Sequence, residues 1–226
     1  MNSVTLQGSK NPIPVSKIIC VGRNYAEHAK EMKAELPSNP VLFLKPPSAI
    51  VASGGAVVLP SISNDLHHEV ELTVLLGKGG RDIPKESALG YVAGYGIGLD
   101  MTLRDVQSEA KKKGLPWSLA KGFDTSAPLS EFIPATSVPD PHRLFLRLTV
   151  NGEVRQQGTT SNFIFRLEYL ISYISQFFTL NSGDVLFTGT PEGVAQTVPG
   201  DSLEATLSDD GNRPLATLAV RIEGWR

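Results

Sequence analysis

The chain has very little cysteine, no long apolar run and no excess of positive charge. Its one cysteine, Cys20, cannot form an internal disulfide, so the fold does not need an oxidising compartment. No apolar run approaches the roughly 20 residues that span a bilayer, and residues 1–17 lack the pattern of a signal peptide. A net charge of −2 is far from the basic surface that nucleic-acid binding needs. We therefore expect a cytoplasmic protein without a membrane or nucleic-acid partner.

Glycine and proline are plentiful, with 21 and 16 residues, and they separate short segments rich in Val, Ile and Leu. This pattern favours a mostly β fold with a few helices. Asn151 and Gly152 have the composition of a two-residue hairpin turn, leading into a strand at 153–157. The other strands are expected at residues 17–21, 41–44, 56–59, 68–76, 91–100, 144–150, 184–188, 202–206 and 216–222.

Three further segments have helical patterns: residues 24–33, 102–113 and 166–178. The first is expected to be capped by Asn24 and the second by Thr102. The third has apolar residues at helical spacing, which predicts that it packs on a sheet. The basic run at 111–113 closes the second helix, and we interpret it as a solvated helix end.

Two glutamates alternate with apolar residues in the segment 68–76. Glu69 and Glu71 would share one side of a strand, while Val70 and Leu72 face the other. Two carboxylates held together in a buried place repel, so one must take up a proton or a cation must lie between them. The pair alone is more typical of the exposed face of an edge strand.

A third carboxylate strengthens the case for a metal. Asp100 ends the glycine-rich segment 91–100, which has the composition of a buried strand, and an acidic group there is costly without a partner. Three carboxylates without a Cys or His ligand suit a hard ion such as Mg²⁺ or Mn²⁺. We therefore predict a metal site formed by Glu69, Glu71 and Asp100. A helix-capping role for Asp100 is the alternative.

Several polar residues could carry the chemistry. His28 and Glu31 are three residues apart on a predicted helix, so the carboxylate could orient the imidazole as a general base. Arg104 and Gln107 have the same spacing after Asp100 and could bind a carboxylate and a carbonyl. A surface role remains open for each pair, and Lys121 could be a substrate cation or an ordinary loop lysine.

Ordered motifs along the chain resemble the fumarylacetoacetate hydrolase superfamily, and its single-domain acylpyruvase branch most closely. The resemblance runs from about Ser16 to the end, which predicts a catalytic domain at residues 16–226 after an N-terminal arm at 1–15. The motifs are RNYAEH at 23–28, FLKP at 43–46, HEVE at 68–71, DMTLRDVQ at 100–107, Lys121 with Phe123, and TGTPEGV at 188–194.

The resemblance implies an α+β, mostly β fold, a mixed β-sandwich or roll with peripheral helices, assembled as a homodimer. It places Mg²⁺ or Mn²⁺ on the three carboxylates and a catalytic dyad, His28 with Glu31, on a lid over the substrate. The residues that it assigns to substrate contact or catalysis are Arg23, Lys45, Arg104, Gln107, Lys121 and Thr190. The fourth acidic ligand of the larger hydrolases has no match here, so fumarylacetoacetate itself is not the expected substrate.

The resemblance implies a hydrolase that cleaves the C3–C4 bond of small 2,4-dioxo acids, the acylpyruvates. The metal would stabilise the pyruvate enolate that leaves, His28 would activate a water, and Lys121 with Gln107 would stabilise the oxyanion. The same enolate arises when oxaloacetate loses CO2 or when enol and keto forms interconvert, so decarboxylase and tautomerase remain alternatives. A metal-stabilised binding module is the non-enzymatic alternative.

Overall fold

Two facing β-sheets form the body of the protein in a computed structural model that describes residues 2–31, 37–210 and 212–225. The larger sheet has the order β4–β3–β15–β8–β9–β11–β5, with β12 paired to β9. Its strands are β3 (Ile18–Gly22), β4 (Val41–Lys45), β5 (Ile50–Ala52), β8 (Val70–Leu76), β9 (Val92–Leu99), β11 (Ala127–Leu129), β12 (Ile133–Pro134) and β15 (Val185–Phe187).

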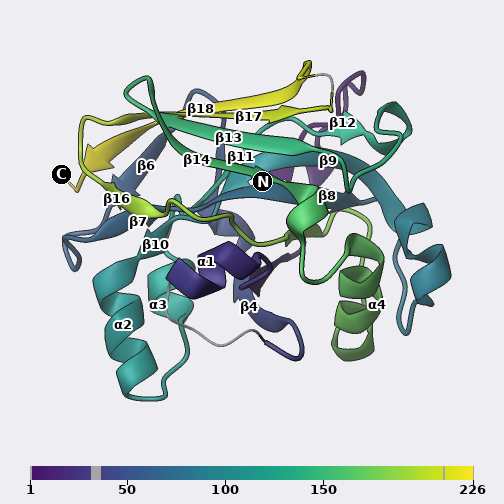
Figure 1. Cartoon of the computed structure of the whole chain (residues 1–226), viewed down its shortest axis with the longest axis horizontal. Coiled ribbons are helices and arrows are strands. Elements are labelled where there is room, and N and C mark those ends of the chain that lie inside the picture. Colours follow the sequence, from purple (N-terminus) through teal and green to yellow (C-terminus); the bar gives the residue numbers. More distant parts are fainter. Residues whose placement is uncertain (1, 32–36, 211, 226) are drawn as a thin grey trace.

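The second sheet has the order β14–β13–β17–β18–β6 and lies above the first in Figure 1. Its strands are β6 (Ala56–Leu59), β13 (Phe145–Val150), β14 (Glu153–Thr159), β17 (Ser202–Ser208) and β18 (Pro214–Gly224). Two smaller sheets complete the set, one of β7 (Leu66–His68), β10 (Thr102–Leu103) and β16 (Ala195–Thr197), the other of β1 (Ser3–Val4) and β2 (Ile13–Pro14). The mostly β, mixed sandwich expected from the sequence is confirmed.

The helices lie at the edges of the sheets. They are α1 (Ala26–Glu31), α2 (Arg104–Lys112), α3 (Ser118–Lys121) and α4 (Leu167–Phe177), with 3-10 turns at Pro47–Ala49, Lys85–Tyr91, Ala135–Ser137 and Thr160–Asn162. In Figure 1, α1, α2 and α3 gather near β4 on the side away from the five-stranded sheet, and α4 stands apart from them. No helix in the described ranges is long and apolar enough to cross a membrane.

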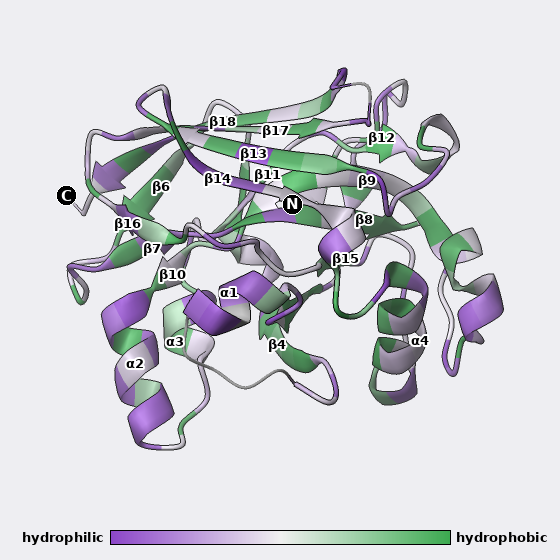
Figure 2. Cartoon of the chain, viewed as in Figure 1, coloured by the Kyte–Doolittle hydropathy of each residue, from purple (hydrophilic) through white to green (hydrophobic). Residues whose placement is uncertain are grey.

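The main core fills the space between the two large sheets. Alternate residues of β8, namely Val70, Leu72 and Val74, point into it and are fully buried. Figure 2 shows hydrophobic residues concentrated on the strands, whereas α1 and α2 are largely hydrophilic. The strand β8 lies between β15 and β9, and all of its residues are buried. The alternative of an exposed edge strand carrying Glu69 and Glu71 is therefore wrong.

The opposite face of the larger sheet changes character along β8. At one end Leu75 packs in a second cluster with Phe187 and with Cys20, whose thiol is free and buried. The N-terminal arm is part of this cluster, because Val4 and Val15 are buried in it. The arm is thus packed rather than loose, although a domain division at residue 15 stays a prediction. Towards the other end, the same face carries Thr73, Glu71 and Glu69.

The two predicted helix caps are wrong, because tertiary contacts use both side chains. Asn24 Nδ2 donates to the carbonyl oxygens of Thr188 (2.8 Å) and Phe165 (3.1 Å), so Asn24 ties the end of β3 to two loops. Thr102 lies in β10, and its hydroxyl donates to the Asp100 carbonyl at 3.0 Å. The extended backbone there continues to Leu103, so α2 begins two residues later than predicted. The predicted end of the first helix, at residue 33, lies outside the described residues.

Candidate metal centre

The three predicted carboxylates meet because neighbouring strands place them side by side. Glu69 directly precedes β8, Asp100 directly follows its antiparallel partner β9, and the Asp100 amide donates to the Glu69 carbonyl at 2.8 Å. Glu71 lies opposite Gly98, where an added Cβ would approach the ring of Phe187 to 2.8 Å. One ligand atom from each carboxylate lies within 4.8 Å of the others. The site therefore has the buried, all-oxygen donor set that Mg²⁺ and Mn²⁺ prefer.

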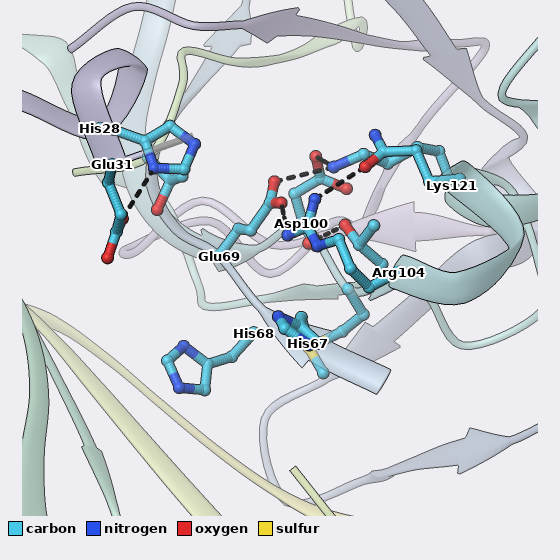
Figure 3. Close-up of polar contacts among 12 residues, drawn as sticks. His28, Glu31, His67, His68, Glu69, Asp100, Arg104 and Lys121 are labelled. Atoms are coloured by element: carbon cyan, nitrogen blue, oxygen red, sulfur yellow. Dashed lines mark hydrogen bonds and ion pairs between the residues drawn. The ribbon is translucent and has the colours of Figure 1, made fainter. Parts of the chain in front are cut away.

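Three cations contact two of these carboxylates. Lys121 Nζ donates to Glu69 Oε2 at 2.7 Å and to Asp100 Oδ2 at 2.5 Å. Arg104 Nη2 donates to Glu69 Oε1 at 2.5 Å, and Lys45 Nζ lies 2.8 Å from Asp100 Oδ1. Figure 3 shows Lys121 and Arg104 reaching Glu69 from the same side. Burial alone would raise the pKa of Glu69, but Lys121 and Arg104 outweigh it and hold that pKa well below its ordinary range.

Glu71 has a different environment from its two neighbours. It accepts a hydrogen bond from the Gly189 amide at 2.6 Å, but no ammonium or guanidinium group of the described residues lies within 4.0 Å of it. Burial, together with the charges of Asp100 and Glu69, raises the pKa of Glu71 well above its ordinary range. The cluster is thus short of positive charge at Glu71, and a divalent cation among the three carboxylates would supply it.

The His28–Glu31 pair borders the same cavity. His28 Nδ1 lies 3.3 Å from Glu31 Oε2, and the imidazole is largely buried. In Figure 3 the other ring nitrogen of His28 is on the side of Glu69. Glu31 also accepts from the Gly193 amide, at 3.2 Å to each carboxylate oxygen. The carboxylate therefore orients the imidazole towards the cavity, as the predicted dyad requires.

The helix α2 presents one polar stripe to the cavity. Arg104, Gln107 and Lys111 follow each other at spacings of three and four residues, and all three line the cavity. Arg104 Nη1 donates to Gln107 Oε1 at 2.7 Å, so the two predicted substrate residues are already aligned. Sequence reasoning missed Lys111, because it treated the basic run at 111–113 as entirely solvated. The spacing from Arg104 and Gln107 was the signal that separates Lys111 from its neighbours.

The remaining predicted substrate residues differ in position. Thr190 is buried and lines the cavity, and Arg23 also lines it, with the left-handed backbone φ of 63° that non-glycine residues adopt at a cost. Lys45 is not on the cavity wall. Its ammonium group is fully buried, facing Asp100 and donating to the carbonyls of Met101 (3.2 Å) and Lys121. The structure places Lys45 where it supports Asp100, and contact with a substrate stays a prediction.

Gln156 is a buried polar residue that sequence reasoning also missed. Its carbonyl oxygen accepts from the Val70 amide at 3.0 Å and lies 2.9 Å from His68 Nδ1. Its amide donates to Thr190 Oγ1 and to the Pro191 carbonyl, both at 2.9 Å. Gln156 therefore connects the strand that bears the acidic residues to the loop that holds Thr190. The local sequence has no signal for this role, because the predicted hairpin there gives no reason for a buried amide.

Comparison with known proteins agrees with this geometry. The family model described as fumarylacetoacetate (FAA) hydrolase C-terminal matches residues 17–223. The chain belongs to this family. Among relatives within the fumarylacetoacetate hydrolase family, the mitochondrial oxaloacetate tautomerase of Mus musculus is 56% identical over 190 residues, covering 84% of this chain and 86% of that protein. The mitochondrial oxaloacetate decarboxylase of Dictyostelium discoideum is 49% identical over 193 residues, covering 85% and 88%.

A solved structure of the same family has a very similar fold. It is fumarylpyruvate hydrolase from Pseudomonas aeruginosa in complex with Mn²⁺ and pyruvate, with a TM-score of 0.91 and 41% identity, covering 99% of this chain and 96% of that one. The relatives are thus enzymes with different reactions on small oxo-acids. The buried carboxylates and the Mn²⁺ of this relative both point to divalent-metal binding.

Proposed function

We propose that the protein is a divalent-metal enzyme that interconverts the enol and keto forms of oxaloacetate. The proposal rests on one observation. Glu69, Glu71 and Asp100 are buried together without enough positive charge to balance them, and the cavity beside them is also lined by cationic side chains. The substrate class comes from the relatives, since oxaloacetate tautomerases of Mus musculus and Escherichia coli are 56% and 51% identical to this chain.

A divalent ion held by Glu69, Glu71 and Asp100 would supply a Lewis acid for the carboxylate and 2-oxo oxygens of the substrate. Cationic side chains of the protein would add positive charge near the same substrate oxygens. Burial lowers the pKa of Lys121, but Asp100 and Glu69 outweigh this, and the net effect raises it. Lys121 therefore stays an ammonium ion at neutral pH and stabilises negative charge on a substrate oxygen.

With Lys121 held as a cation, His28 is the group suited to move a proton. An imidazole can both accept and donate a proton, and Glu31 holds its Nδ1 while the other nitrogen faces the cavity. Enol–keto interconversion moves one proton between the enol oxygen and C3, and it needs no attacking water. Arg104 and Gln107, already hydrogen-bonded to each other, lie where they would orient the substrate carboxylate.

Hydrolysis of an acylpyruvate is the second candidate, and the His28–Glu31 pair favours it. The same imidazole, oriented by Glu31, would take a proton from a water that attacks the C4 carbonyl. The fumarylpyruvate hydrolase of similar fold supports this reading. Decarboxylation of oxaloacetate, the reaction named for the Dictyostelium discoideum relative, requires neither water nor C4 attack and remains the third.

A substrate panel with Mg²⁺ tests the proposal. Oxaloacetate enol absorbance and CO2 release are followed together, alongside cleavage of acetylpyruvate. We expect enol–keto turnover that EDTA abolishes and Mg²⁺ or Mn²⁺ restores while the protein stays folded.

Because Glu31 positions His28, Glu31→Gln should lower kcat about 10- to 100-fold. Glu27→Gln is the matched control, since Glu27 is exposed and its ion pair is with Lys30, which is also exposed. If no substrate of the panel shows metal-dependent turnover, the protein is better described as a metal-stabilised binding module.

Two further properties remain predictions. We propose a homodimer, which is the assembly that the family resemblance implies, and a cytoplasmic location. Several relatives are mitochondrial proteins, so the compartment differs within the family.

A further inference from the structure

One wall of the cavity alternates positive and aromatic groups. Lys121 Nζ lies 4.9 Å from the centre of the Phe43 ring, and the Phe43 and Trp117 rings are 5.9 Å apart. Lys111 Nζ lies 5.2 Å from the Trp117 ring at the far end. All four residues line the cavity. The wall therefore runs from the carboxylate cluster, which Lys121 contacts, to a second cation on α2.

Lys111 differs from the lysines that follow it. All three lysines are exposed, but Lys112 and Lys113 pair with Glu109, at 2.9 Å and 3.7 Å. Lys111 instead lies on the stripe of Arg104 and Gln107, against Trp117. In the described part of the chain, no carboxylate lies within 4.0 Å of its ammonium group, so its hydrogen-bond donors are available to a ligand.

The surroundings of Lys111 are strongly positive. Burial, then the charges of Arg104 and Arg23, lower the pKa of Lys111. Arg104 and Arg23 share the cavity lining with Lys111, although the lining also includes the three carboxylates of the candidate metal centre. The excess of positive charge is thus local to the surroundings of Lys111, where it attracts an anionic group. A bound anion near Lys111 would relieve the repulsion among these cations. The wall between the two cationic ends is aromatic, so it can pack against the carbon atoms of a short, flat chain.

We propose that Lys111, seated on Trp117, binds the second carboxylate of a dianionic 2-oxo acid whose first carboxylate lies at the metal centre. The proposal rests on the proposed function for the position of the first carboxylate. It makes Lys111 a specificity-determining residue, because an oxo-acid with an uncharged tail has nothing to place beside it. Oxaloacetate and dioxo acids with a terminal carboxylate belong to the favoured class, and acetylpyruvate does not.

Calorimetry of the Mg²⁺-loaded protein with two stable probes of equal length tests the proposal. The probes are 2-oxoglutarate, which has a second carboxylate, and 2-oxopentanoate, which ends in a methyl group. Lys111→Met should raise the Kd of 2-oxoglutarate about five- to tenfold, the size expected for one partly exposed charged contact. The Kd of 2-oxopentanoate should change less than twofold, and Lys111→Arg should retain most of the preference.

Lys112→Met is the matched control. It removes one positive charge from the next position of the same helix, where the side chain is 71% exposed, and methionine is as good a helix former as lysine. We expect it to change neither Kd by more than twofold. Equal losses for both probes, no loss for 2-oxoglutarate, the same loss in Lys112→Met, or no binding of either probe to the wild type would each overturn the proposal.

The two proposals fail in different ways. Binding of 2-oxoglutarate that depends on Lys111, in a protein that turns over no oxo-acid, contradicts the proposed function and supports the carboxylate subsite. The subsite alone is contradicted if the protein turns over oxaloacetate with a metal but its affinity for 2-oxoglutarate does not depend on Lys111.

Discussion

At the scale of the residue, one buried amide joins the two halves of the candidate site. Gln156 bonds the backbone beside Glu69 through its carbonyl oxygen and the Thr190 loop through its amide. The same loop donates its Gly189 amide to Glu71 and its Gly193 amide to Glu31. A shift of this loop would therefore disturb a carboxylate of the metal centre and the orientation of His28 together.

Replacing Gln156 tests this connection. Gln156→Met keeps the length of the side chain but leaves several buried polar groups without partners, so we expect a loss of about 2–4 kcal/mol in the free energy of unfolding. The activity should also fall, with a raised KM, because Thr190 loses its anchor. Urea unfolding and steady-state kinetics measure the two effects. Gln157→Met is the control at the exposed neighbouring position, expected within about 0.5 kcal/mol of the wild type. Equal effects of the two variants would contradict the role of Gln156.

Sequence reasoning found the charged residues of the site more easily than the amide. Glu69, Glu71 and Asp100 stand out because a carboxylate in or beside a buried strand needs a partner, whatever the fold. Gln156 has no such signal, since a glutamine on a hairpin is ordinary until the partner loop is known. Lys45 shows the reverse case. The sequence motif named it as a substrate-contact residue, which stays a prediction, whereas its burial behind Asp100 follows from the sheet pairing of β3 and β4.

At the scale of the element, α2 matters most because it carries Arg104, Gln107 and Lys111. Its start is held by Asp105, whose carboxylate accepts from Ser63 Oγ at 2.6 Å, from the Val106 amide at 2.8 Å and from the Asn64 amide at 3.3 Å. Burial is the largest single influence and would raise the pKa of Asp105, but the hydrogen bonds together outweigh it and lower that pKa. The helix is thus fixed to the segment that leads into β7.

Asp105→Ala should therefore destabilise the protein by about 1–2 kcal/mol at neutral pH, by losing a helix-start carboxylate and its hydrogen bonds. The pKa of Asp105 is lower in the folded state, so the stabilisation exists above the ordinary Asp pKa and is lost as the pH falls through the folded value. The difference between wild type and variant should shrink below about pH 4. Unfolding curves at several pH values measure it. Glu109→Ala, an exposed site on the same helix, should leave the stability close to that of the wild type and serves as control.

The elements themselves were predictable where a regular pattern decides them. The alternation in β8 and the helical spacing of α4 each led to the right structure, because the buried faces repeat with the period of the backbone. The helix starts were not predictable from local signals. Asn24 and Thr102 are good capping residues, yet Asn24 is drawn into contacts with Phe165 and Thr188, and sheet pairing keeps the chain extended through Thr102.

At the scale of the whole molecule, the two faces of the larger sheet have different roles, one in packing and the other in the candidate metal centre. One face of β8 packs against the five-stranded sheet, and the other bears the acidic residues. Burying three carboxylates there costs free energy, and Lys121, Arg104 and Lys45 offset that cost for only two of them. The fold therefore tolerates the centre without metal through these ion pairs, and the unpaired Glu71 makes metal binding favourable.

The uneven distribution of cations predicts that two matched variants differ in stability without metal. In EDTA, Glu69→Gln should cost about 3–5 kcal/mol, because it leaves Lys121 and Arg104 without a buried partner. Glu71→Gln should cost little, because the glutamine oxygen can still accept from the Gly189 amide and no cation is stranded. With Mg²⁺ at about 100 times its Kd, the wild type should gain about 2.7 kcal/mol. Glu71→Gln should lose most of that gain.

Thermal and urea unfolding of the wild type and of both variants, each with EDTA and with Mg²⁺, measure these differences. If Glu71→Gln responds to Mg²⁺ as the wild type does, Glu71 is not a ligand. If Glu71→Gln is as damaging as Glu69→Gln in EDTA, the uneven distribution of cations does not control the stability of the centre. A variant that is mild in EDTA and yet loses most of the Mg²⁺-dependent gain in stability is expected only if Glu71 is a ligand of the ion.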